Sequence, residues 1–366
     1  MRASISEISC QVKGVLKRNV SLEKLLLMKG KIFLLLPLFL MANDIKSPEQ
    51  IQEELNRAEA QFRHAKKLFN PWYTGPLITP SAAMVPPGYV MTQPYVYVAD
   101  NYAMFNQERK SISLPSNLVS VKLLPFFYQI GVTKTVDVSL IASGVMNWQS
   151  GQFGGGFNDM TTILGFLMQP ETLYVPQVKF TVSQTFPTGK YKNLSTNGLN
   201  LNASGAGAYA TQFGITFSKV LFWARLHPLN ARTFFGYTLS TPVHVKNFNT
   251  YGGGFGTRGT VHPGNSLAAD LGLELSINQK WVFALDLVYT ANNRTKFHGN
   301  PGVSASGKIA NVGGGYNDNL SLCPAIEYNW ADWGGFIGGA WFSVYGRSSL
   351  NFAQAVLSAY MILPPD

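Results

Sequence analysis

The chain has 366 residues, of which only 13% are charged and 13% aromatic, and it contains 35 glycines. Soluble domains usually carry about 25% charged residues, and no apolar run here reaches the ~20 residues that a membrane-spanning helix needs. The composition argues against an ordinary soluble domain and against helical membrane spans. It is typical of a β-barrel that crosses a membrane with its strands.

The net charge of +10 first suggests a nucleic-acid partner. Residues 1–42 hold seven Lys/Arg and two Asp/Glu, which leaves only +5 on the rest of the chain. That excess is scattered and too small for a nucleic-acid footprint. Two cysteines, Cys10 and Cys323, are too few for a disulfide framework.

The N-terminal residues 1–42 have the features of an export leader. A basic stretch from Met28 to Lys31 precedes the apolar run Ile32–Met41, which is the order found in a signal peptide. We expect cleavage after Ala42 and translation from Met28, with residues 1–27 upstream of the true start.

A helix is predicted over Ser47–Phe69. Ser47 can cap it, Pro48 suits its first turn, and Gln50 completes a capping box. One apolar stripe runs along this helix, so we expect it to rest on the rim of the barrel or to bind a partner or the lumen. Residues 70–94 are rich in proline and predict an extended connector. Together residues 43–94 form a periplasmic segment.

The stretch Ser266–Thr290 shows the clearest alternation in the chain. Apolar side chains occupy every second position on both sides of a tight turn at Asn278–Gln279, and the positions between them carry small residues and a few acids. Period-two alternation marks strands whose faces meet different environments. An apolar face opposite small and acidic residues predicts a barrel hairpin, with lipid outside and a narrow lumen inside.

From Tyr95 onward the sequence predicts an all-β, membrane-spanning, antiparallel up-and-down barrel (95–366) of about twelve strands. Short connections mostly alternate with long ones rich in Gly, Asn and Ser, which predicts tight periplasmic turns, long outer loops and both chain ends in the periplasm. Trp223, Trp281, Trp330 and Trp333 lie at predicted periplasmic turns, where an aromatic girdle is expected. The expected strands are 95–105, 118–130, 134–147, 158–168, 175–186, 207–219, 232–246, 266–276, 280–291, 319–328, 334–345 and 353–363.

Two short motifs and the final amphipathic strand resemble an outer-membrane barrel family. The motifs are Gly156-Phe157-Asn158-Asp159-Met160 and Phe186-Pro187-Thr188-Gly189, and the similarity covers Val136 to the C-terminus. The family is named for the meta-cleavage pathway of phenol degradation. The resemblance implies an exported barrel that passes small hydrophobic or aromatic compounds. Such barrels commonly end on an aromatic residue, whereas this chain ends on Asp366, so Tyr360 would have to substitute as the assembly signal.

Catalytic motifs are weak in this sequence. Gly254–Gly259 fits a dinucleotide-binding pattern by letter, but a strand follows it where that pattern needs a helix. The enzymatic alternative is an outer-membrane lipid hydrolase, for which His244 is the best candidate base; its strand turns it inward, away from lipid. No histidine pair or cysteine cluster has metal-ligand spacing. We therefore expect no enzymatic activity, no cofactor and no metal.

The inner faces of the predicted strands carry charged residues. If Ser276 pairs with Lys280 across the turn, Asp270 opposes Asp286, and facing carboxylates need cations or a shared proton. These acids would form a salt-bridge network that stiffens a narrow lumen, or a lining that selects solutes. The expected lumen-lining residues are the acids Asp270, Glu274, Asp286 and Glu327, the basic partners Lys122, Lys179, Lys280 and Arg347, and His244.

The function predicted from the sequence is passive passage of small solutes through the outer membrane of a diderm bacterium. The alternative is a non-conducting surface barrel whose long loops bind a partner. Expected partners are outer-membrane lipid and lipopolysaccharide, the outer-membrane assembly machinery and small solutes, with no nucleic acid. The sequence leaves open whether residues 43–94 enter the lumen.

Overall fold

The computed structural model describes residues 46–68, 75–197 and 199–365, so the predicted leader (1–42) lies outside the described residues. The chain divides after Asn56, and the barrel belongs to the second unit. None of the described helices is long and apolar enough to cross a membrane.

Helix α2 (Pro48–Leu68) begins with the predicted capping box. The Gln50 N–H donates to Ser47 Oγ at 3.3 Å, and the Ser47 N–H donates to Gln50 Oε1 at 2.9 Å. Two backbone donors at the start of the helix are thereby satisfied. The prediction of a helix here is confirmed.

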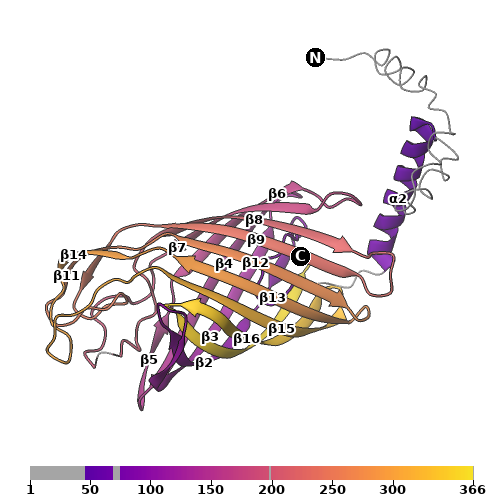
Figure 1. The fold of residues 1–366 in the computed structure, drawn as a ribbon. Coiled ribbons are helices and arrows are strands. Elements are labelled where there is room, and N and C mark those ends of the chain that lie inside the picture. The colour runs from indigo at the N-terminus through magenta and orange to yellow at the C-terminus, as the bar shows by residue number, and fades with distance from the viewer. Residues whose placement is uncertain (1–45, 69–74, 198, 366) are drawn as a thin grey trace, which may run out of the picture. The chain divides into compact units, whose positions relative to one another are not determined.

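Within the described residues, twelve antiparallel strands close into a ring because the last strand pairs with the first (Figure 1). This confirms the predicted architecture. A short strand, β1 (Val90–Thr92), precedes them and pairs with both β3 and β17, although a connector without strands was predicted there. The ring consists of β2 (Tyr95–Phe105), β3 (Ser111–Gly131), β4 (Val136–Gln149), β6 (Met160–Gln169), β7 (Gln177–Phe186), β8 (Ala210–Leu221), β9 (Leu229–Ser240), β12 (Ser266–Ser276), β13 (Trp281–Asn292), β15 (Asn317–Ala331), β16 (Gly334–Arg347) and β17 (Leu350–Leu363).

The strands turn apolar side chains outward. On β12, Leu267, Leu271 and Leu275 are exposed, whereas Glu274 and Ser276, on either side of Leu275, are buried. The same alternation holds for β13, where Phe283 is exposed and its neighbours are buried. A continuous apolar outer surface is costly in water but favourable against hydrocarbon.

The hairpin β12–β13 has a different register from the expected one. Ser276 pairs with Val282, and Asp286 pairs with Gly272 instead of Asp270. The turn therefore spans Ile277–Lys280, where the Asn278 side chain accepts hydrogen bonds from the N–H groups of Lys280 and Trp281. A shift of two residues keeps every side chain on its expected face.

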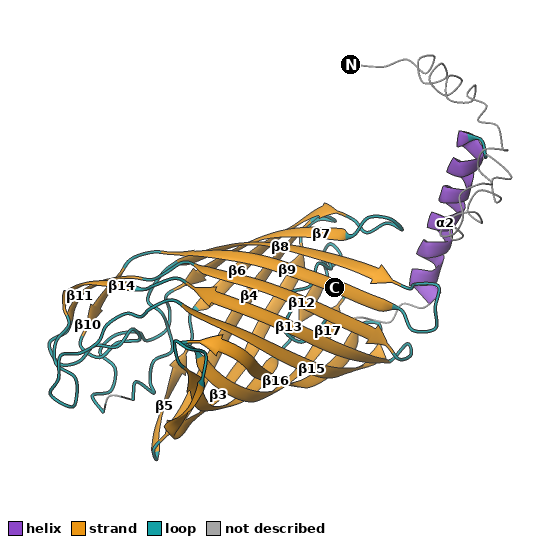
Figure 2. Cartoon of the chain, in the orientation of Figure 1, coloured by secondary structure: helices purple, strands orange, loops and turns teal. Residues whose placement is uncertain are grey.

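The two ends of the barrel differ. One end carries short connections between strands, together with the start of β2 and the end of β17. The other end carries the long connections 187–209, 241–265 and 293–316. Within these, β10 (Val243–Lys246), β11 (Arg258–His262) and β14 (Lys296–Asn300) form a separate three-stranded sheet (Figure 2). A further strand, β5 (Gln152–Phe157), extends the β3–β4 wall at this end.

Candidate functional site: the lumen and its inner segment

Residues 75–88, here called the inner segment, lie against the inner wall of the barrel. The N–H groups of Ile78 and Thr79 donate to the two carboxylate oxygens of Asp286 on β13, at 3.2 and 2.9 Å. The Gly75 N–H donates to Glu274 Oε1 on β12 at 3.1 Å. Both carboxylates are fully buried. Charged acceptors make stronger hydrogen bonds than neutral ones, so this side of the wall holds the segment firmly.

The inner segment then crosses to another part of the wall. Gln177 and Lys179 on β7 donate to the carbonyl oxygens of Ala82 and Ala83, at 2.6 and 3.3 Å. Further along, the Gly88 N–H donates to the Gly131 carbonyl at the end of β3. The contacts thus run from β12–β13 to β7 and on to β3, which places the segment across the lumen in the half with short connections.

Apolar side chains anchor the same segment. Leu77 is 2% exposed and belongs to a buried cluster with Cys323, Ile337 and Val356 from β15, β16 and β17. Tyr95, Tyr97 and Trp341 pack against this cluster. The inner wall is therefore apolar and aromatic over β15, β16, β17 and β2, in contrast to the small or ionic lining expected from the sequence.

Glycines let the inner segment approach closely. Gly75 has a φ of +119°, and a Cβ there would lie 2.7 Å from Arg232 Nη1. On the wall, a Cβ at Gly272 would meet Pro76 Cγ at 2.5 Å. No side chain fits at either contact without displacing its neighbour.

Arg232 on β9 supplies the positive charge beside Glu274. Its Nη2 lies 2.9 Å from Glu274 Oε2, with both side chains buried. Asn230 Nδ2 donates to the same oxygen at 2.8 Å. On β15, Glu327 accepts a hydrogen bond from Asn329, and Asn329 in turn accepts one from Tyr360. Glu274 is thus held by two neighbours on the adjacent strand β9 and by the inner segment, whereas Glu327 is held by Asn329 of its own strand.

A second buried ion pair spans three strands. Lys179 Nζ on β7 lies 2.7 Å from Asp137 Oδ2 on β4, and β6 runs between them. Gln129 donates to the same oxygen at 2.7 Å. The same lysine holds Ala83 of the inner segment, so this ion pair and the segment share one anchor.

The expected basic partners of the four acids are placed differently. Lys179 pairs with Asp137, and Lys122 lies over the Tyr97 ring at 5.8 Å. Lys280 lies in the β12–β13 turn, and Arg347 lies at the rim. Among the described residues the ion pair to this acidic wall comes from Arg232. The predicted basic partners of the four acids were therefore wrong, because strand order and tilt decide which side chains meet.

His244 does not line the barrel wall as expected. β9 ends at Ser240, and His244 lies exposed on β10, where its Nδ1 is 3.0 Å from Thr260 Oγ1. The strand stops because Pro242 lacks the N–H that ladder pairing requires. Asp270, by contrast, keeps its expected face on β12 and is half-buried.

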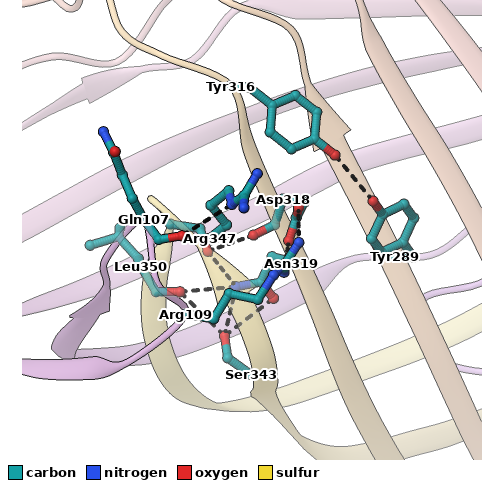
Figure 3. A network of polar contacts seen from close by, with 10 residues as sticks. Gln107, Arg109, Tyr289, Tyr316, Asp318, Asn319, Ser343, Arg347 and Leu350 are labelled. Carbon is teal, nitrogen blue, oxygen red and sulfur yellow. Dashed lines mark hydrogen bonds and ion pairs between the residues drawn. The ribbon is translucent and has the colours of Figure 1, made fainter.

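A rim network joins the β2–β3 connection to β15 and β16 (Figure 3). The Arg109 guanidinium binds both oxygens of buried Asp318, at 2.5 and 2.8 Å, and Arg347 Nε donates to the Gln107 carbonyl. The Tyr289 hydroxyl lies 3.3 Å from that of Tyr316, and this hydrogen bond raises the pKa of Tyr316 to about 12. The connection is thereby fixed over the seam at which the ring closes.

The two motifs that carry the family resemblance meet at the long-loop end. The Met160 N–H donates to Thr188 Oγ1, and the Thr188 hydroxyl donates to the Asn158 carbonyl, both at 3.0 Å. Asp159 accepts N–H bonds from Gly189 at 2.8 Å and Ala206 at 2.7 Å. The motifs therefore have a structural role, which is to hold the long β7–β8 connection on the rim.

Sequence reasoning missed Arg232 and Asp137, and it left open whether any part of residues 43–94 enters the lumen. Arg232 shares its face with Thr238, so the alternation along β9 contained the signal for its inward position. The segment gave no such signal, since its wall contacts use backbone N–H and carbonyl groups that every sequence possesses.

No protein-family model matches the sequence, and no curated protein matches it. Among solved structures, the chain is similar to the COG4313 outer membrane channel from Pseudomonas putida F1, with a TM-score of 0.55 and 13% identity over 78% of this chain and 100% of that chain. The translocator domain of autotransporter NalP from Neisseria meningitidis gives a TM-score of 0.42 and 9% identity over 85% of this chain and 97% of that chain. The NanC porin gives a TM-score of 0.32 and 9% identity over 73% of this chain and 98% of that chain. The first match shows a shared barrel fold; the other two scores are too low to add to it.

Proposed function

We propose that this protein is an outer-membrane channel for passive passage of small solutes, closed in this conformation by its own inner segment. The observation that carries the proposal is the buried contact of Ile78 and Thr79 with Asp286 inside a closed ring of strands. Conduction then requires the segment to leave its seat. Orientation follows the general rule for bacterial barrels, with long loops outside and both termini in the periplasm.

The solutes that fit best are small and partly apolar or aromatic. With the segment displaced, the lumen would expose the Tyr95, Tyr97 and Trp341 side chains next to the carboxylates of Glu274 and Asp286. Aromatic walls bind flat apolar groups, and carboxylates bind hydrogen-bond donors. This lining supports membership in the phenol meta-pathway family, as do the paired motifs at the rim.

Planar-bilayer recordings test the proposal with a matched pair of variants. Asp286→Asn weakens the hold on two N–H groups, and loss of one charged hydrogen bond costs about 1.5–3 kcal/mol. The ratio of open to closed channels should rise about ten-fold or more. Asp270→Asn removes the same charge from the neighbouring strand, and the structure records no hydrogen bond from Asp270 to the inner segment. It should leave this ratio unchanged.

Two outcomes would contradict the proposal. Equal effects of the two substitutions would mean that charge alone, and not the seat of the segment, sets conductance. Absence of conductance from the wild type and from Asp286→Asn would favour the alternative, a non-conducting barrel whose loops bind a partner. Of the loop aromatics suited to that role, Phe255 is 53% exposed, whereas Phe248 is buried beneath it.

A further inference from the structure

The three long connections have an unusual charge. Residues 187–209, 241–265 and 293–316 contain seven Lys/Arg and not one Asp or Glu. Three of the five histidines of the chain lie in them as well. Since the chain from residue 43 onward carries a net charge of only +5, the positive excess of the whole barrel is concentrated at this end.

The sheet β10–β11–β14 gathers much of this charge on one surface. Val243, Val245 and Val261 are buried on one face of the sheet and pack against Tyr191 and Phe297. Because successive side chains alternate, the opposite face, here called the basic face, carries His244, Lys246, Arg258, His262, Lys296 and His298, all of them exposed.

The register places two cations side by side and a third opposite a histidine. Lys246 pairs with Arg258, and Lys296 pairs with His262. The rings of His262 and His298 lie 5.5 Å apart. Like charges directly opposite one another destabilise a sheet, and within the described residues no carboxylate forms an ion pair with Lys246, Arg258 or Lys296. The surface is therefore complementary to an anion with several charges supplied from outside the chain.

A metal ion fits this surface poorly. Across the described residues, no group of three or more His, Cys, Asp or Glu side chains is placed to hold one. The three neighbouring cations would also repel a divalent ion. Charge complementarity favours phosphate, which binds arginine and lysine through charge-assisted hydrogen bonds.

The basic face lies close to the apolar outer surface of the barrel strands. β10 begins three residues after β9 ends, and β11 and β14 stand within four residues of β12 and β13. At about 3.3 Å per residue, that separation is on the order of 10–15 Å. Lipid-facing side chains such as Tyr237 and Leu267 end just below it. Charged lipid headgroups occupy this depth beside a membrane barrel.

We propose that the basic face binds phosphate groups on the headgroups of anionic lipids in the leaflet at the long-loop end. This rests on the proposed membrane location but not on conduction. Lys246, Arg258 and Lys296 contact the phosphates, and the histidines border them. The loop sheet would thereby be held at the membrane surface.

The binding test uses the full chain, folded in zwitterionic detergent and titrated with bis-phosphorylated lipid A. The variant K246Q/R258Q/K296Q removes three cations from the basic face. The control K190Q/K192Q/K308Q removes three cations from the same connections at positions outside the sheet β10–β11–β14. With about 1 kcal/mol for each cation near a lipid surface, the first variant should bind about 100-fold more weakly. The control should stay within about three-fold of the wild type.

Companion titrations separate the sources of phosphate. Lipid A stripped of both phosphates should bind about 100-fold more weakly than the intact lipid to the wild type, and inorganic pyrophosphate should not compete at equal concentration. Equal losses in both triple variants, undiminished binding of the stripped lipid, or full competition by pyrophosphate would each overturn the proposal. Both triple variants should retain wild-type conductance in bilayers. A wild-type protein that does not conduct would contradict the proposed channel function, and the lipid titration would still decide whether the basic face binds phosphate.

Discussion

Asp137 on β4 and Lys179 on β7 form a buried ion pair across the intervening strand β6, directly over Gly165. A Cβ at Gly165 would lie 2.2 Å from Asp137 Oδ1 and 2.5 Å from Lys179 Cε. Two charged side chains can reach each other past a whole strand only because that strand offers no side chain at the crossing. The same lysine also holds Ala83, so the fold of the wall and the seat of the inner segment depend on one glycine.

Gly165→Val should therefore destabilise the barrel. The new side chain separates the pair and leaves two buried charges without each other, which costs about 3–5 kcal/mol. Unfolding in urea in the presence of lipid vesicles, followed by tryptophan fluorescence, measures this loss. Gly144→Ala is the control, because a Cβ there makes only an ordinary contact at 3.5 Å with Gly156 O. An unchanged midpoint for Gly165→Val would show that the ion pair contributes nothing.

Gly75→Val should loosen the inner segment without disturbing the strands. The residue has a positive φ, and a Cβ there would lie 2.7 Å from Arg232 Nη1. An L side chain in this backbone region costs about 1–2 kcal/mol before any clash. A cysteine at Leu77, with Cys10 and Cys323 changed to alanine, should react with a membrane-impermeant maleimide about 5-fold to 30-fold faster in this variant. Gly151→Val carries the same backbone strain at a φ of +74° with nothing within 4 Å, and its labelling rate should match that of the parent. Equal rates for all three proteins would rule out a seat at Gly75.

The Arg109–Asp318 contact should stabilise the rim. Asp318 is buried and the bond is bidentate, so Arg109→Gln should lower the urea midpoint of unfolding by leaving a buried carboxylate without its partner. Urea midpoints measure the effect. Glu108→Gln changes a neighbouring exposed charge and should have no effect. A loss as large in Glu108→Gln would point to net charge and not to this contact.

Acid should weaken the contact between α2 and the β6–β7 connection. A hydrogen bond from the Leu173 N–H lowers the pKa of Glu59, with Arg63 as a further cause. The contact is thus fully present above the ordinary pKa of glutamate, about 4.3, and is lost as the pH falls through the lowered value. Trp223 packs on Phe62 of this helix at 5.5 Å and reports the change when it carries a fluorine label for NMR. In Glu59→Gln the signal should not titrate; a titration identical to wild type would assign it to another group.

The sequence predicted those parts of the fold that depend on alternation. Leu271 and Leu275 face outward and Glu274 and Asp286 inward as expected, because a period of two fixes the face of each side chain. The strand register and the ion-pair partners were harder to predict from the sequence. The Asn278 side chain set a longer turn than expected, and Arg232 replaced the predicted partners of the acids. The sequence left open whether residues 43–94 enter the lumen, and the contacts of the inner segment could not be predicted, since Ile78 and Thr79 bind Asp286 through N–H groups that carry no sequence signal.

The proposal that residues 75–88 close the lumen can be tested most directly with Leu77→Cys. Leu77 lies in one buried cluster with the native Cys323. The protein, with Cys10 changed to alanine, is reconstituted in planar bilayers and oxidised with copper phenanthroline, and mass spectrometry verifies the crosslink. Crosslinked protein should pass almost no current, and a reductant should restore openings. In the control that carries both Leu77→Cys and Cys323→Ala, neither the oxidant nor the reductant should change the current. Crosslinked channels that conduct like reduced ones would contradict a pore closed by residues 75–88.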